Sequence, residues 1–149
     1  MSAYPLFHII HLFCAVAFVG GVFFEGLVLS VMHTKAVSRE ARREVEKALS
    51  RRAVKVMPWV VGGVFLSGLS LAWLRYLPNL AAPLAASFNT QLTLKVVLAF
   101  SILLHFLIAV TKMRRGTLTK NWSRYIHAVV LAHMVLIVLL AKTMFYFVW

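Results

Sequence analysis

The sequence has few acidic residues and almost no cysteine. Only 4 Asp or Glu residues accompany 16 Lys or Arg residues, and charged residues form 13% of its 149 residues, about half the share of an ordinary soluble domain. A single cysteine, Cys14, excludes a disulfide framework and a thiolate metal site. A nucleophile elbow and a glycine-rich phosphate loop are both missing. These absences leave no basis for a secreted disulfide scaffold, a hydrolase or a nucleotide-driven enzyme.

Long apolar runs fill most of the chain instead. Four of them, at about residues 4–32, 56–75, 91–112 and 122–148, have near the ~20 residues that a membrane-spanning helix needs. A soluble bundle is disfavoured, because each of its helices would carry a polar stripe. The sequence therefore predicts an all-α integral membrane protein of one domain, residues 1–149, with four transmembrane helices in an antiparallel bundle.

The basic residues gather in two of the three connections between these runs. One group lies in residues 33–55 and the other in residues 112–124, around the connection between the third and fourth runs. Their members are Lys35, Arg39, Arg42, Arg43, Lys47, Arg51, Arg52, Lys55, Lys112, Arg114, Arg115, Lys120 and Arg124. By the positive-inside rule, both connections face the cytoplasm and both termini lie on the non-cytoplasmic side. We expect a multi-pass protein of a bacterial inner membrane whose cations attract anionic lipid head groups rather than nucleic acid.

Local signals refine the spans. Ser38 is a candidate N-cap for a helix in the basic connector 33–55. Pro58 is expected in the first turn of the second span, where proline is tolerated. Glycines in the first two spans predict close approach of neighbouring helices. The apolar connection 76–90 predicts an interfacial helix or a lid rather than a free loop.

Titratable side chains inside the spans carry the functional signal. Five histidines lie there: His8, His11, His105, His127 and His133. Each imidazole in lipid is costly unless it is paired, hydrated or bound to a metal. Metal ligation, haem ligation and proton relay are therefore the candidate chemistries.

Helical spacing limits how these histidines can combine. His8 and His11 are one turn apart on one face, and His11, Phe18 and Glu25 recur every seven residues on a shared face. His127 and His133 are about 120° apart around their helix, so they cannot both bind one iron. Hydrogen bonding inside the bundle is the structural alternative for each histidine. Lys95 and Lys142 either extend to the membrane interface or pair with haem propionates.

The first span resembles a known pattern. His11 is followed after six residues by Phe18-Val19-Gly20-Gly21, and later segments read Ser67-Gly68-Leu69 and Thr93-Leu94-Lys95-Val96. This layout over almost the whole chain resembles the CopD-like membrane domain and the related HemJ-type protoporphyrinogen oxidases. Phe18 stands where those families usually have Trp, and Glu25-Gly26 replaces a Pro-Arg stretch.

The resemblance implies binding of b-type haem in a homo-oligomer such as a dimer, with a role in electron transfer or oxidation and an unknown redox partner. It implies that His11 is a haem ligand and that Lys95 is functionally required. The second axial ligand would come from His133, His105 or another subunit. The first alternative is a CopD-like copper protein that uses His8, His11 and His133. The second is a membrane scaffold subunit without a cofactor, in which the histidines are hydrogen-bonded.

Overall fold

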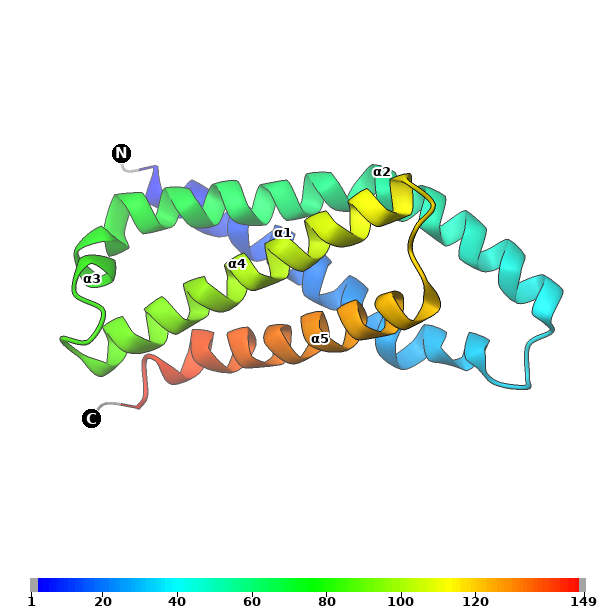
Figure 1. Cartoon of the computed structure of the whole chain (residues 1–149). Coiled ribbons are helices and arrows are strands. Elements are labelled where there is room, and N and C mark those ends of the chain that lie inside the picture. The colour runs from blue at the N-terminus through cyan, green and yellow to red at the C-terminus, as the bar shows by residue number, and fades with distance from the viewer. Residues whose placement is uncertain (1–2, 148–149) are drawn as a thin grey trace. The chain divides into compact units, whose positions relative to one another are not determined.

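A computed structural model describes residues 3–147 as a chain of helices, with no strand in that range (Figure 1). Helix α1 (Tyr4–Phe23) continues through a π-helical turn (Phe24–Val28) and a 3₁₀ turn (Leu29–His33). The remaining helices are α2 (Arg39–Leu71), which leads into a π-helical turn (Ala72–Tyr76), and then α3 (Leu77–Ala81), α4 (Ser87–Arg114) and α5 (Lys120–Thr143).

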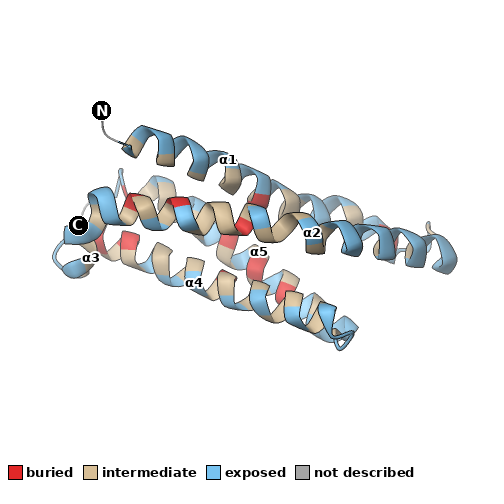
Figure 2. Cartoon of the chain, turned by 90° about the horizontal axis from the view of Figure 1, so that it is seen from above, coloured by how far each residue is buried: buried red, intermediate tan, exposed pale blue. Residues whose placement is uncertain are grey.

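Four helices are long and apolar enough to cross a membrane: Tyr4–His33, Arg39–Ala81, Ser87–Arg114 and Lys120–Thr143. Much of their apolar surface is exposed, as the colouring by burial shows (Figure 2). Trp59 is 83% exposed and Phe13 is 70% exposed, which suits lipid contact and not water. The predicted all-α membrane class is confirmed. Residue 148, the predicted end of the fourth span, lies outside the described residues.

Helix α2 begins where the Ser38 signal predicts, and it differs from the prediction only at Pro58. The backbone N–H of Ala41 donates to Ser38 Oγ at 3.2 Å, which confirms the predicted cap. The helix then continues without a break from the basic connector into the second span. Pro58 consequently lies inside α2, and its predicted place in a first turn is wrong. The favourable cap and the helix-forming residues after it move the start of the helix to Arg39.

The predicted face of His11, Phe18 and Glu25 is only partly regular. The α-helical geometry ends at Phe23, and Glu25 belongs to the π-helical turn. A π turn holds more residues than an α turn, so it rotates the side chains that follow it. Phe18 is buried whereas Glu25 is exposed.

The chain groups into two compact units, Met1–Ser70 and Leu71–Trp149. In the first unit, α1 and α2 approach each other closely at glycines. A Cβ added to Gly63 would lie 2.6 Å from Cys14 Sγ, and one added to Gly21 would lie 3.4 Å from Met57 Cε. A Cβ on Gly20 or Gly62 would meet no atom within 4 Å. The predicted close approach therefore holds at some glycines and not at others.

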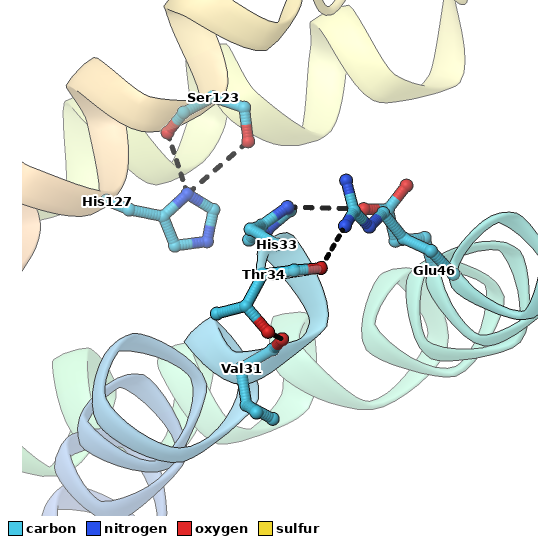
Figure 3. A network of polar contacts seen from close by, with 7 residues as sticks. Val31, His33, Thr34, Glu46, Ser123 and His127 are labelled. Carbon is cyan, nitrogen blue, oxygen red and sulfur yellow. Dashed lines mark hydrogen bonds and ion pairs between the residues drawn. The ribbon is translucent and has the colours of Figure 1, made fainter. Parts of the chain in front are cut away.

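Polar contacts fasten the beginning of α2 to the end of the first span (Figure 3). His33 Nδ1 lies 3.8 Å from Glu46 Oε1. Arg42 Nη2 donates to the Thr34 carbonyl at 3.0 Å, and Thr34 Oγ1 donates to the Val31 carbonyl at 2.7 Å. This contact is an ion pair only when His33 is protonated. Because the His33 side chain is 67% exposed and that of Glu46 is 44% exposed, the contact stabilises the turn only weakly.

In the second unit, buried amides tie the ends of the helices together. Asn79 Nδ2 donates to Asn89 Oδ1 at 2.8 Å, and Asn89 Nδ2 donates to the Ala82 carbonyl at 2.9 Å. Gln91 accepts a hydrogen bond from Thr143 Oγ1 at 2.9 Å. The connection predicted as an interfacial helix or lid contains the short helix α3 and is held to α4 by these amides. Such satisfied polar groups fix where α4 begins.

Candidate functional site

The side chain of His11 extends from α1 onto α2. Its Nδ1 donates to the carbonyl oxygen of Val64 at 3.0 Å, and Ser67 Oγ lies 3.2 Å from the same nitrogen. A Cβ built on Gly68 would lie 3.0 Å from His11 Cε1, so only a glycine leaves room for the ring at this distance. The imidazole is therefore seated on a glycine and bonded to the backbone of a second helix.

This contact determines which nitrogen of His11 carries the proton. A carbonyl oxygen can only accept a hydrogen bond, so Nδ1 must be protonated when His11 is neutral. The lone pair of the neutral ring is then on Nε2. Histidines that bind metals through Nε2 nearly always donate Nδ1–H to a carbonyl or a carboxylate. The His11 ring has the hydrogen-bonding arrangement of such a ligand.

Histidines of the second unit reach the same tautomer by a local route. Each donates Nδ1–H at 2.7 Å to the carbonyl four residues earlier on its own helix: His105 to Ser101, His127 to Ser123 and His133 to Val129. The His127 contact is drawn in Figure 3. All three neutral rings therefore carry their lone pair on Nε2 as well.

Two of these rings meet between α4 and α5. The centroids of His105 and His133 are 6.2 Å apart, and the Tyr125 ring lies 6.0 Å from His105. Ser101 Oγ lies 3.2 Å from His133 Nε2 and donates to it, because that nitrogen holds the lone pair. Within residues 3–147, no hydrogen bond to His105 Nε2 is present. His105 therefore has the more accessible lone pair of the two.

Three further predicted site residues are His8, His127 and Lys95. His8 is exposed on α1, with its ring 5.7 Å from that of Tyr4. His127 lies in the first third of α5, and Lys95 is partly buried in α4. No three His, Cys, Asp or Glu side chains in the described residues gather closely enough to hold a metal ion together.

Residue types alone did not identify the hydrogen-bond partners. The Val64 carbonyl has no sequence signal, and Ser67 and Ser101 look like ordinary small residues of membrane helices. A histidine that follows a serine by four residues, as at Ser101–His105 and Ser123–His127, is a weak local signal. In comparisons with protein-family models, curated proteins and solved structures, no match to the chain is found.

Proposed function

We propose that this multi-pass membrane protein binds haem b and acts in electron transfer or in an oxidation, with His11 as one axial ligand. The hydrogen bond of 3.0 Å from His11 Nδ1 to the Val64 carbonyl carries this proposal. It holds the ring in one orientation and raises the basicity of Nε2, as ligand histidines require. When bound, the haem iron supplies one-electron chemistry, and the protein controls its ligands, polarity and access.

His105 and His133 are the candidates in the second unit for the second axial ligand, and they differ in what their Nε2 atoms already bind. Ser101 Oγ occupies the lone pair of His133 Nε2 at 3.2 Å, so ligation by His133 would require that hydrogen bond to break. His105 keeps its Nδ1 bond to the Ser101 carbonyl and would lose no hydrogen bond at Nε2. A histidine from a second copy of the chain, in a homo-oligomer such as a dimer, is the other source of this ligand.

Lys95 is the candidate partner of a haem propionate. Its ammonium group is carried by α4 within a span, and the side chain is partly buried. A carboxylate of the haem would offset the cost of placing this cation in an apolar setting. The resemblance to the HemJ-type family implies that Lys95 is functionally required, which is compatible with this role.

The orientation follows from charge. We place the basic residues of 33–55 and 112–124 in the cytoplasm and both termini outside it, in a bacterial inner membrane. A reporter enzyme that works only outside the cytoplasm should be active when it is fused after residue 149. A reporter that works only in the cytoplasm should be inactive at the same site. Activity of a cytoplasmic reporter at that site contradicts this orientation.

Optical spectra of the purified full-length protein test the haem proposal. The wild type should show a Soret band that shifts on reduction, and His11→Ala should lose most of its haem. His33→Ala is the matched control, because His33 is a largely exposed imidazole that pairs with Glu46 and lies outside the histidine sites. Wild-type protein that takes up no haem, or full haem retention in His11→Ala, contradicts the proposal.

Copper binding is the second candidate, and the His105–His133 pair favours it. The ring centres of His105 and His133 are 6.2 Å apart. Binding of one ion by both rings would require the hydrogen bond from Ser101 Oγ to His133 Nε2 to break. Imidazole nitrogens suit copper. Stoichiometric copper without iron in the purified protein, and its loss in His105→Ala, would favour copper binding. A purified protein that contains neither copper nor iron would favour a cofactor-free scaffold subunit.

A further inference from the structure

The contacts around His11 involve a residue with no role in the proposal above. Ser67 is buried, with 3% of its surface exposed, and its hydroxyl lies 3.2 Å from His11 Nδ1. The Ser67 hydroxyl also donates to the carbonyl of Gly63, one turn earlier on α2. Since its one proton is used there, its oxygen faces Nδ1 as an acceptor.

The Nδ1 proton of His11 is consequently shared between two acceptors, the Val64 carbonyl at 3.0 Å and Ser67 Oγ at 3.2 Å. Two acceptors withdraw this proton more than one does, which makes Nε2 a stronger electron donor. They also restrict rotation of the ring about its Cβ–Cγ bond, because both belong to the same turn of α2.

We propose that Ser67 is a positioning residue of His11: its hydroxyl oxygen is a second acceptor for the Nδ1 proton, restricts the orientation of the ring and strengthens Nε2 as a ligand. The part that concerns haem rests on the function proposed above, whereas the part that concerns the hydrogen bond at Nδ1 does not. A residue that only filled space between α1 and α2 would affect stability without affecting the electronic character of His11.

Ser67→Ala removes the hydroxyl and leaves the Val64 carbonyl in place. Loss of the group that hydrogen-bonds to a ligand histidine typically lowers metal affinity 10–100-fold. Because the Val64 carbonyl remains as an acceptor in Ser67→Ala, we expect a loss of haem affinity near the lower limit, about tenfold. The midpoint potential of bound haem should rise, because a weaker donor stabilises the oxidised iron less. Ser70→Ala is the matched control. Ser70 lies about one turn after Ser67 on α2, and its Oγ donates to the Leu66 carbonyl at 2.9 Å and not to His11.

Nitrogen NMR of haem-free, ¹⁵N-histidine-labelled protein in detergent provides a readout that needs no haem. The His11 signals, identified by their absence in His11→Ala, should show one Nδ1-protonated tautomer in wild type and Ser70→Ala. Because the Val64 carbonyl remains as an acceptor, Ser67→Ala should keep the Nδ1-protonated tautomer, but its Nδ1 signal should shift away from that of wild type and Ser70→Ala. Ser67→Thr, which keeps the hydroxyl, should restore the wild-type signal and potential. Ser67→Cys, whose sulfur is only a weak acceptor, replaces Ser67→Ala if that variant loses its helical circular dichroism.

The outcomes are separable. Identical His11 spectra and haem affinity in Ser67→Ala and Ser70→Ala overturn the role of Ser67, whatever binds at Nε2. A wild-type tautomer mixture, or a Ser67→Thr protein that behaves as if the hydroxyl were absent, also overturns it. A protein without haem whose His11 Nδ1 signal depends on Ser67 supports the positioning role and contradicts only the proposed function.

Discussion

The two units of the chain orient their histidines in different ways. In the first unit, the Nδ1 bond of His11 joins residues 53 apart in sequence and crosses from α1 to α2. In the second unit, His105, His127 and His133 each bond to a carbonyl four residues earlier on the same helix. The same tautomer is thus reached by tertiary packing in one region and by helix geometry in the other.

This difference separates what can disturb each ring. An i to i−4 bond needs only the helix and a suitable side-chain rotamer, because the helix places that carbonyl near the side chain. The His11 bond exists only while α1 and α2 remain in register along their glycine contacts. Packing substitutions should therefore alter His11 and leave the Nδ1 bonds of the second unit unchanged.

The largest expected effect comes from the glycines of the first unit. Gly63→Ala should be less stable than Gly62→Ala by about 1–3 kcal/mol, the usual cost of overpacking. The added Cβ would lie 2.6 Å from Cys14 Sγ at Gly63 and would meet nothing within 4 Å at Gly62. Both substitutions change helix propensity equally, so their difference isolates the contact. Thermal unfolding in detergent measures it.

Two results would contradict this view of the α1–α2 contact. One is equal stability of Gly63→Ala and Gly62→Ala. The other is a failure of Cys14→Ala to recover stability in the Gly63→Ala background, since removing the sulfur removes the atom that the new Cβ meets.

A smaller effect is expected in the second unit at Ser101. Ser101→Ala removes the donor 3.2 Å from His133 Nε2, at a cost of about 0.5–1.5 kcal/mol. It retains the Ser101 carbonyl, so His105 keeps its Nδ1 bond. In ¹⁵N spectra, the His133 Nε2 signal should shift while the His105 tautomer stays unchanged. A changed His105 tautomer would show that this ring depends on more than its own helix.

The smallest effect is expected at Ser123. Its carbonyl accepts the 2.7 Å bond from His127 Nδ1, whereas its hydroxyl is 3.5 Å away from that nitrogen. Ser123→Ala keeps the carbonyl, so the free energy of unfolding should change by less than about 0.5 kcal/mol. Equilibrium unfolding in detergent tests this, and a loss as large as that of Ser101→Ala contradicts the assignment of the bond to the backbone.

Sequence reasoning found the elements more readily than the contacts. The four spans and the Ser38 cap followed from apolar runs and a local capping signal, and the structure confirms them. Pro58 was placed wrongly, because the strength of the helix before it cannot be judged from the proline alone. The residue pattern also gives no signal for the π-helical turn at Phe24–Val28. For that reason, the prediction that Glu25 continues the helix face of His11 and Phe18 holds only in part.

The pairing of His105 with His133 was equally hidden from the sequence. Spacing along α5 showed that His127 and His133 point in different directions, which excludes one pair. Which of the two meets His105 depends on how α4 and α5 rotate and slide against each other. That choice reflects the packing of many apolar side chains, none of which is decisive by itself.

The sequence by itself determined that the chain forms four apolar helices with basic connections and imidazoles inside the spans, because length, hydrophobicity and charge act locally. Only the tertiary structure decided that His11 donates to Val64, beside Ser67 and over Gly68, and that His105 and His133 lie together. Hydrogen bonds between helices need donor and acceptor within about 3 Å and in line. That condition depends on helix rotation and offset, which local residue patterns do not specify.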